Sequence, residues 1–368
     1  MLEIQFYSRQ QHQPPLYIYI YTYIGSIMKI RDTINGHISP LPPIWFMRQA
    51  GRYLPEYKAL RETTSDFISY CLDSEKASEA TLQPINRFDF DAAIIFSDIL
   101  MIPWAMNRGV HFITGEGPKL TPLEHPSDLV VPNNADLMKK LQPVCDAITK
   151  TRANLSDDKA LIGFCGAPWT VATYMLEGGS SRDFAISRKW LWQEPEACDQ
   201  LMQHLVTASI ELLTGKARAG ADILMIFDSW AGVVPSTLRH RYLIDPVANI
   251  ISGLRARGIS LPVIAFPKGL SGGFDTYVHA TGCDVLAIDH TVDPFWLDAH
   301  LPKNVIVQGN LDPLSVETGG QSMAEAADQI IMAFRKRPHI FNLGHGIGQF
   351  TPIKHVEELL RHLRQTYQ

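Results

Sequence analysis

The strongest constraint on the fold of this 368-residue chain is a pattern that repeats from residue 43 onward. A short apolar run is followed by a polar or glycine-rich corner and then by a helical stretch. Short continuous runs of Val, Ile, Leu and Phe are typical of parallel strands that are buried on both faces. Eight such runs occur, at residues 44–47, 93–96, 161–165, 223–227, 263–266, 285–288, 305–307 and 340–343.

The stretches between the apolar runs have the spacing of amphipathic helices. Ala327, Ile330, Ile331 and Phe334, for example, recur at i, i+3, i+4 and i+7, which places them on one helix face. Eight strand–helix repeats in about 325 residues predict an α/β fold with a single (β/α)8 TIM barrel. A doubly wound parallel sheet is the alternative architecture. No linker rich in Gly, Ser and Pro divides residues 28–368, so we expect one domain there.

A barrel of this kind places its active-site cleft at the C-terminal ends of its strands. The residues that directly follow the eight runs should therefore line that cleft. Polar strand ends can simply face solvent, but eight of them together favour a functional site. The residues are Arg48, Gln49, Ser97, Asp98, Gly166, Asp228, Ser229, Lys268, Asp289, His290, Gln308, Asn310, Gly344, His345 and Gly346.

Composition narrows the class of function. A net charge of −5 lacks the basic excess that is usual in nucleic-acid-binding proteins. The five cysteines are scattered and form no CxxC pair, which predicts reduced thiols in a cytoplasmic protein, without a disulfide framework or a cysteine-rich zinc site. No apolar run reaches the roughly 18 residues that span a bilayer. We therefore expect a cytoplasmic protein without a nucleic-acid or membrane partner.

Residues 1–27 differ from the rest of the chain. They combine glutamine-rich polar sequence with alternating Ile and Tyr, and they lack the basic start and cleavage site of a signal peptide. Met28 is followed by Lys29-Ile30-Arg31, which resembles a natural start. We expect residues 1–27 to be an N-terminal extension without catalytic function, either disordered or upstream of the native start.

Three arginines form the densest group of charged residues after the first apolar run. Arg48, Arg52 and Arg61 lie within fourteen residues, close to Trp45 and Tyr53. Arginine stays charged at all working pH values and binds carboxylates with a bidentate fork. The arginines could instead pair with Glu56, Glu62 and Asp66 on the surface. The aromatic flanks favour a half-buried wall that binds an acidic ligand.

Five segments of the sequence resemble the uroporphyrinogen decarboxylase family. Residues 43–57, P-I-W-F-M-R-Q-A-G-R-Y-L-P-E-Y, are similar to the family's first signature. Residues 163–179 resemble its G-F-x-G-x-P-W-T pattern with the following Tyr and Glu-Gly. The shorter matches are F-S-D-I at 96–99, I-F-D-S-W-A-G at 226–232 and N-L-G-H-G at 342–346. All five occur in the family's order, and the resemblance covers residues 28–368.

The resemblance implies a fold and a reaction. The family's fold is a (β/α)8 barrel, in agreement with the strand count. Its substrate is uroporphyrinogen III, a macrocycle of four pyrroles with four acetate and four propionate side chains. The acetates are converted to methyl groups, giving coproporphyrinogen III and CO2 in porphyrin and heme biosynthesis. The family uses no cofactor or metal and is typically a homodimer, so we expect the same here.

Decarboxylation leaves two electrons on carbon, and many decarboxylases use a cofactor to accept them. A pyrrole that is protonated on a ring carbon can accept them instead. The resemblance assigns the central carboxylate to Asp98, which would accept hydrogen bonds from pyrrole N–H groups and stabilise the cationic ring. Arg48 corresponds to the arginine beside the reacting acetate, and its high pKa favours charge stabilisation over proton donation. Tyr174 is the third residue expected to be catalytic.

The remaining matched positions are expected to bind substrate. Arg52 and Arg61 would hold other carboxylates, Ser229 would contact a carboxylate, and Phe227 would form an apolar platform under the macrocycle. His345, between two glycines, would present a hydrogen-bond donor, and its charge is tunable near neutral pH. Gln49 is a weaker candidate. Lys268, Asp289 and His290 stand at strand ends but are not expected to be catalytic.

Two other functions stay open from the sequence. Cobalamin-linked methyltransferases share this fold and bind zinc through His-x-Cys and a distant Cys. No His-x-Cys occurs here, and His279 and Cys283 lack an obvious third thiolate ligand. The second alternative is a tetrapyrrole-binding protein without catalysis, in which Arg48, Asp98 or Tyr174 should be replaced. All three are present.

Overall fold

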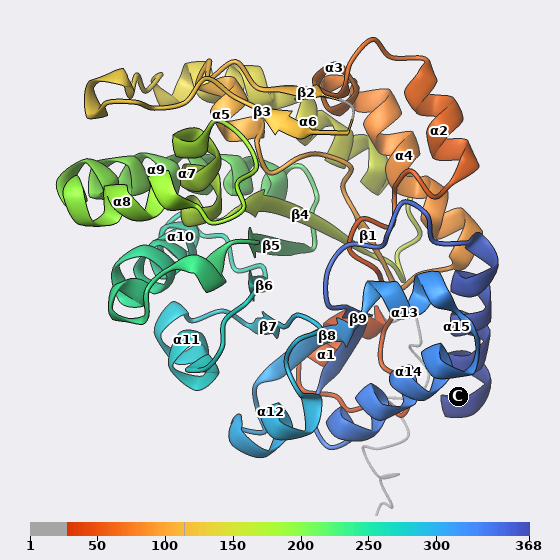
Figure 1. Cartoon of the computed structure of the whole chain (residues 1–368). Helices are drawn as coiled ribbons and strands as arrows, with labels where there is room; N and C mark the ends of the chain where they lie inside the picture. The colour runs from red at the N-terminus through yellow and green to blue at the C-terminus, as the bar shows by residue number, and fades with distance from the viewer. Residues whose placement is uncertain (1–27, 114) are drawn as a thin grey trace, which may run out of the picture.

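Seven of the eight predicted runs form strands of one parallel sheet in the computed structural model, which describes residues 28–113 and 115–368. The sheet curls on itself and the helices pack around its outside (Figure 1). Its order follows the sequence, β1-β4-β5-β6-β7-β8-β9, and every neighbouring pair is parallel. The strands are β1 (Ala92–Ile94), β4 (Ala160–Gly166), β5 (Ile223–Asp228), β6 (Val263–Pro267), β7 (Val285–Ala287), β8 (Ile306–Leu311) and β9 (His339–Leu343).

This strand order excludes the doubly wound alternative. A doubly wound sheet reverses its strand order at one point, because its two halves run outward from a central strand. Here each strand pairs with the next one along the chain, apart from the short hairpin that comes between β1 and β4. All seven residues of β4 are buried, as expected for a strand covered on both faces.

The first predicted strand, residues 44–47, is only an isolated bridge between Ile44 and Phe341 of β9. The backbone of this segment reaches both ends of the sheet. The Phe341 amide donates to the Pro43 carbonyl, and the Asp91 amide, next to β1, donates to the Ile44 carbonyl, both at 2.9 Å. The Ile44 amide donates to the Asp91 carboxylate, at 2.7 Å. The prediction of eight regular strands is therefore only partly confirmed.

Proline explains why this segment forms no regular strand. Pro42 and Pro43 have no backbone N–H and cannot donate to a sheet ladder. At the other end, Arg48 has a φ of +61°, which turns the chain out of the extended conformation. Only a few residues remain between these two interruptions.

Helices alternate with the strands and cover the outer face of the sheet (Figure 1). None of those in the described residues combines the length and apolar character that crossing a membrane requires. The helices are α1 (Lys29–Ile34), α2 (Pro55–Glu62), α3 (Phe67–Leu72), α4 (Ser74–Phe88), α5 (Met101–Ala105), α6 (Asn134–Asn154), α7 (Pro168–Glu177), α8 (Ala185–Gln193), α9 (Pro195–Arg218), α10 (Asp245–Ala256), α11 (Phe274–Thr281), α12 (Pro294–His300), α13 (Pro313–Thr318), α14 (Gly320–Phe334) and α15 (Ile353–Tyr367).

A small antiparallel hairpin, β2 (His111–Ile113) with β3 (Gly117–Lys119), stands apart from the main sheet. Its Phe112 ring lies 4.4 Å from the ring of Phe67 at the start of α3. Phe67 also makes an edge contact with Phe96, just after β1. Aromatic packing therefore connects the hairpin to the segment that carries Asp98.

Candidate active site

Most of the predicted site residues follow the carboxyl ends of successive strands, at one end of the curled sheet. Asp98 follows β1, Tyr174 lies on the helix after β4, and Ser229 follows β5. His345 follows β9, and Arg48 follows the segment that bridges to β9. Because parallel strands end together at one edge, the topology gathers these side chains in one region.

Arg48 occupies a conformation that few side-chain-bearing residues adopt. Its φ of +61° is uncommon outside glycine and is often found at functional sites. Gly346 makes room for its side chain, because a Cβ there would lie 2.3 Å from Arg48 Cδ. The backbone of the segment is fixed by the Ile347 amide, which donates to the Met47 carbonyl at 2.9 Å. Two loops from opposite ends of the chain therefore position this guanidinium.

Asp98 lies close to Arg48 and Tyr174, because the charge of Arg48 acts on the pKa of Asp98 and the charge of Asp98 acts on that of Tyr174. Burial raises the pKa of Asp98, while a hydrogen bond from the Leu100 amide and the charge of Arg48 lower it. The Leu100 bond is 2.8 Å long and fixes one carboxylate oxygen. Upstream, the Phe96 amide donates to the buried Thr81 hydroxyl at 2.8 Å, which anchors the loop to α4.

Tyr174 is mostly buried on α7 and faces the same region. Burial raises its pKa, the charge of Asp98 raises it further, and that of Arg48 lowers it. Its phenol therefore stays protonated near neutral pH and can donate a hydrogen bond. The ring lies 6.4 Å from that of Trp230, whose carbonyl accepts a hydrogen bond from Trp169 Nε1 at 3.0 Å. Trp230 thus connects α7 to the loop after β5.

Phe227 and Ser229 mark the end of β5 and are both half-buried. The Phe227 ring makes edge contacts with Phe164 of β4 and Phe266 of β6, at 5.4 and 6.2 Å. The three rings pack together across three neighbouring strands, with Phe164 and Phe266 buried and Phe227 partly exposed. Phe227 therefore offers an apolar ring face of the kind that suits a flat, apolar ligand.

His345 is surrounded by cationic groups. Its ring lies 6.4 Å from that of Phe266. Burial, followed by the charges of Arg48 and Lys268, lowers the pKa of His345 to about 3. The imidazole of the ligand-free protein is therefore neutral near pH 7, rather than poised to change charge there as its usual pKa suggests.

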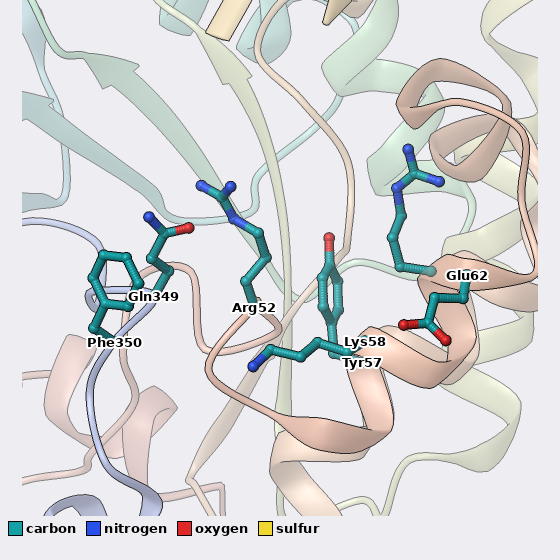
Figure 2. A pocket seen from close by; sticks show the side chains of 7 residues that line it. Arg52, Tyr57, Lys58, Glu62, Gln349 and Phe350 are labelled. Carbon is teal, nitrogen blue, oxygen red and sulfur yellow. The ribbon is translucent and has the colours of Figure 1, made fainter. Parts of the chain in front are cut away.

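Arg52 and Arg61 line a separate cavity of about 310 Å³ beside α2 (Figure 2). The guanidinium of Arg52 extends in the same direction as the hydroxyl of Tyr57 (Figure 2). The cavity lining does not include Asp98 or Arg48. The full lining is Arg52, Tyr57, Lys58, Arg61, Glu62, Gln349 and Phe350.

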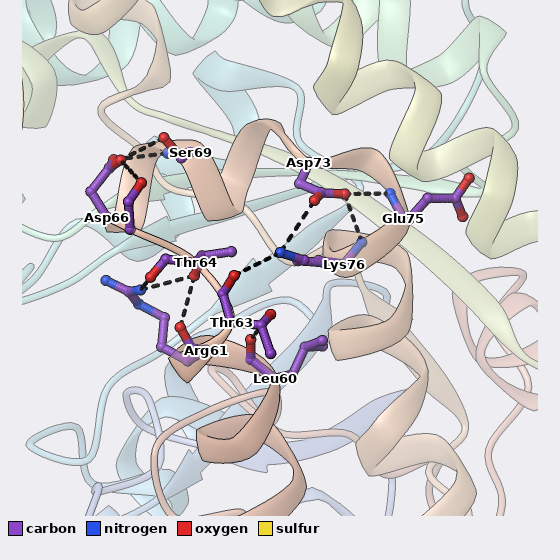
Figure 3. Close-up of polar contacts among 10 residues, drawn as sticks. Leu60, Arg61, Thr63, Thr64, Asp66, Ser69, Asp73, Glu75 and Lys76 are labelled. Carbon is purple, nitrogen blue, oxygen red and sulfur yellow. Dashed lines mark hydrogen bonds and ion pairs between the residues drawn. The ribbon is translucent and has the colours of Figure 1, made fainter.

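Two of the three acidic neighbours of these arginines, Glu56 and Asp66, have other partners. Glu56 pairs with Arg87 at 2.7 Å, and Asp66 accepts a hydrogen bond from the Ser69 amide at the start of α3 (Figure 3). Arg61 donates to the carbonyl and hydroxyl oxygens of Thr64, both at 2.9 Å (Figure 3).

Within residues 28–113 and 115–368, Arg48, Arg52 and Arg61 form no ion pair with an acidic side chain. This arrangement does not support the alternative in which they pair with their acidic neighbours on the surface. It leaves their charge available to an acidic ligand.

Gln49 is the one predicted site residue that faces away from the cleft. Its side chain is fully buried, with its oxygen accepting from the Phe46 amide at 3.1 Å and its nitrogen donating to the Ala92 carbonyl at 2.9 Å. It thereby joins residues 44–47 to β1. The prediction that Gln49 contacts substrate disagrees with this geometry, so we leave it out of the site.

Three residues at or near these strand ends, to which the sequence assigned no catalytic or binding role, have notable surroundings. Lys268 and Trp230 lie together, with the ammonium 5.6 Å from the indole ring. Asp228 is buried, and burial raises its pKa to about 7, with a hydrogen bond from Thr170 opposing the shift. In the sequence, Lys268 and Asp228 could be identified by their position at strand ends. Trp230 could be identified because it lies in the 226–232 segment.

The described part of the chain holds no cluster of three or more His, Cys, Asp or Glu side chains that could bind a metal ion. Of the two residues weighed as zinc ligands, Cys283 is buried and its thiol pKa is raised to about 11 by burial. The thiolate that zinc requires is therefore disfavoured at this position.

Comparison with known proteins adds to this geometry. The family model described as "Uroporphyrinogen decarboxylase (URO-D)" matches residues 28–366. A uroporphyrinogen decarboxylase of Rhizorhabdus wittichii is 47% identical and covers 90% of this chain and 96% of its own length. One from Sphingopyxis alaskensis is 44% identical and covers 92% of this chain and 99% of its own length.

Among solved structures, a methyltransferase from Methanosarcina mazei superposes with a TM-score of 0.76, covering 93% of this chain and 99% of its own. At 16% identity this likeness concerns the fold alone. The sequence relatives are far closer, and they share one name over nearly the whole chain. The chain therefore belongs to the uroporphyrinogen decarboxylase family.

Proposed function

We propose that the cleft at the carboxyl ends of the strands decarboxylates the four acetate side chains of uroporphyrinogen III without a cofactor, giving coproporphyrinogen III and CO2. Membership of the family makes the chain a carboxy-lyase of porphyrin biosynthesis. The observation that carries the assignment to this cleft is the proximity of Asp98, Arg48 and Tyr174: the Arg48 charge acts on Asp98, and the charges of both act on Tyr174.

Asp98 supplies the charge that the reaction needs. Protonation of a pyrrole ring carbon creates a cationic ring, and the C–COO⁻ bonding electrons flow into it as CO2 departs. A fixed carboxylate next to the ring accepts pyrrole N–H hydrogen bonds and stabilises that cation as it forms. The Leu100 amide already orients one oxygen of Asp98, so little reorganisation is needed during the reaction.

Each acetate converted to a methyl group releases one CO2 and takes up one proton in exchange. Arg48 lies close enough to Asp98 to lower its pKa and is exposed at the cleft. We assign it to the reacting acetate, where it holds the carboxylate and balances its charge. Solvent or another acidic group supplies the proton, because a guanidinium releases its own too reluctantly.

The other residues hold the macrocycle. Phe227 packs under the pyrroles, Ser229 and neutral His345 hydrogen-bond to carboxylates, and Tyr174 donates to Asp98 or to a carboxylate. Arg52 and Arg61 bind carboxylates at the outer cavity. A flexible octacarboxylate reaching from the central group to that cavity accounts for cations in two places.

The decisive test is an anaerobic decarboxylation assay on the purified protein. With uroporphyrinogen III and no added cofactor or metal, the proposal predicts four CO2 released per macrocycle and accumulation of coproporphyrinogen III. Binding of uroporphyrinogen without loss of carboxyl groups would instead support the non-catalytic alternative. Activity that needs added zinc or a methyl donor would support the methyltransferase.

Three further features belong to the proposal. Residues 43–47 act as the eighth strand of a closed barrel, supported by their backbone bonds to β9 and to the residue before β1. By resemblance to the family, the protein is a cytoplasmic homodimer. Light scattering of the purified protein tests the dimer, which a mass of one 41.3 kDa chain would contradict.

A further inference from the structure

The backbone of Lys268, directly after β6, is held from both sides. Its amide donates to the Asp228 carbonyl and its carbonyl accepts from the Gly232 amide, each at 3.0 Å. The next amide, that of Gly269, donates to the Asp289 carboxylate at 2.6 Å. A Cβ on Gly232 would lie 2.7 Å from the Gly269 carbonyl oxygen, so the two loops approach as closely as backbones can. The position of Lys268 is therefore fixed by its neighbours on β5 and β7.

The ammonium of Lys268 has no ion-pair or hydrogen-bond partner within residues 28–113 and 115–368. It lies 5.6 Å from the centre of the Trp230 ring and is half-buried. Asp289 is the nearby acid, but its carboxylate already accepts hydrogen bonds from the Gly269 amide and from the amide and hydroxyl of Thr291. Asp289 holds the loops together and leaves the ammonium without a direct counter-ion.

The surroundings of Lys268 favour an anion. Burial lowers the pKa of Lys268, the Asp289 charge raises it and the Arg48 charge lowers it. Burial keeps His345 neutral, and the charges of Arg48 and Lys268 act in the same direction. A partly desolvated ammonium beside a second cation is unfavourable until a negative group approaches. A carboxylate bound between these groups would relieve the repulsion.

We propose that Lys268 is a further substrate-binding residue, whose ammonium holds a carboxylate of the tetrapyrrole on the β6 side of the cleft, three strands along the sheet from the segment that carries Asp98. This inference rests on the proposed function, since it assigns one of the eight carboxylates to a new contact. It adds a cation at the centre of the site, separate from the outer pair Arg52 and Arg61. Rigid placement by β5 and β7 suits a contact that fixes the orientation of the macrocycle.

The test compares Lys268→Met, which removes the charge, with Lys268→Arg, which keeps it. Loss of one charge-assisted hydrogen bond should raise KM for uroporphyrinogen III by about tenfold, with a smaller change in kcat. Lys268→Arg should stay near the wild-type KM. Lys354→Met on α15 is the matched control, because its side chain is 79% exposed and pairs with Glu358 on its own helix.

Product inhibition shows whether Lys268 binds a propionate or an acetate of the macrocycle. Coproporphyrinogen III keeps its four propionates but has no acetates. Weaker inhibition of Lys268→Met by coproporphyrinogen assigns the contact to a propionate, whereas unchanged inhibition with a raised KM assigns it to an acetate. Thermal unfolding of each variant checks the fold, and Lys268→Gln replaces Lys268→Met if the latter does not fold.

The outcomes separate this inference from the proposed function. If the wild-type protein turns over uroporphyrinogen and both KM and product inhibition of Lys268→Met match those of Lys354→Met, Lys268 binds no carboxylate and the inference is overturned. If Lys268→Arg is as impaired as Lys268→Met, the side chain is structural and the inference is also overturned. If the wild-type protein releases no CO2, the proposed function itself fails.

Discussion

At the scale of single residues, the site depends on a few side chains that are held in costly conformations or environments. Arg48 adopts a positive φ, and its side chain passes next to Gly346, where a larger residue would clash with it. Asp98 and Asp228 are carboxylates whose pKa values burial raises. Such residues lower the stability of the fold and are typically retained because function needs them. Each therefore gives a sharp mutational test.

Gly346→Ala should impair catalysis through Arg48 alone. The new methyl group would lie 2.3 Å from Arg48 Cδ, so the guanidinium must move. Because misplacement of a catalytic group by about 1 Å can lower rates on the order of 10²-fold, we expect a large fall in kcat with little change in melting temperature. Steady-state kinetics and thermal unfolding measure both.

The matched control is Gly272→Ala, because a Cβ there meets nothing within 4 Å and the φ of Gly272 is ordinary. It should behave like the wild-type protein. Wild-type kcat in Gly346→Ala would show that the position of Arg48 does not matter to the rate.

Asp228→Asn should increase stability at high pH. Asp228 has a folded pKa of about 7, above the value of 3.8 expected when unfolded, so between these pH values the folded state holds the extra proton. Stability from this group is present below pH 3.8 and is lost as the pH rises through 7. The amide removes that loss, and Asn can still accept from Thr170, which donates at 2.6 Å.

Denaturant unfolding between pH 4 and 8 tests this prediction. The stability of Asp228→Asn relative to wild type should rise with pH, by about 1 kcal/mol or more at pH 8. Asp157→Asn, at an exposed position, is the control. If the free energy of unfolding had the same pH dependence in Asp228→Asn and wild type, ionisation of Asp228 would not destabilise the folded state, and the prediction would be wrong.

The sequence predicted which positions gather at the strand ends better than it predicted their detailed surroundings. Arg48, Asp98, Tyr174 and His345 follow strand ends or motif segments, and the topology of the sheet brings such positions together. Gln49 is adjacent to Arg48 in sequence, but the turn at Arg48 points it into the core, where it bonds to Phe46 and Ala92. Lys268 lacks an ion-pair partner because the Asp289 carboxylate accepts hydrogen bonds from Gly269 and Thr291 instead. No local sequence pattern reveals these hydrogen bonds.

At the scale of elements, the seven regular strands were predictable because buried parallel strands leave continuous apolar runs. Residues 44–47 have the same composition, but the two prolines before them cannot donate to a ladder, and the amides of Ile44, Phe46 and Met47 donate to side chains instead. Asp91 compensates, with one carboxylate oxygen accepting from the Ile44 amide and the other lying 3.2 Å from Lys29 Nζ. A side chain thus replaces a strand carbonyl at the junction between the ends of the sheet.

Asp91→Ala should therefore destabilise the protein. A buried backbone amide left without an acceptor typically lowers the free energy of unfolding by about 1–3 kcal/mol. Urea unfolding measures the loss. Asp91→Asn keeps an oxygen for the Ile44 amide and should lose less. Equal stability of Asp91→Ala and wild type would mean that residues 44–47 need no such support.

At the scale of the whole molecule, a chain with a net charge of −5 must bind an acidic substrate through local cations. In the proposed site these cations are Arg48 and Lys268, which both act on His345, together with Arg52 and Arg61 at the cavity beside α2. All four come from residues 28–366, the part that matches the family. The predicted N-terminal extension, residues 1–27, lies outside the described residues.

A chain that begins at Met28 should keep the kcat and KM of the full chain. The matched family positions and all the proposed site residues are retained in it. Side-by-side kinetics and thermal unfolding of the two chains test this expectation. A truncated chain that folds but has lost activity would assign a catalytic role to residues 1–27.

The most direct measurement is anaerobic single-turnover CO2 release by Asp98→Asn compared with the wild-type protein. The account predicts a rate lower by on the order of 10² or more, because the amide removes the negative charge that faces the cationic pyrrole. Thermal unfolding and inhibition by coproporphyrinogen should stay close to wild type. A single-turnover rate near that of the wild-type protein would contradict the account.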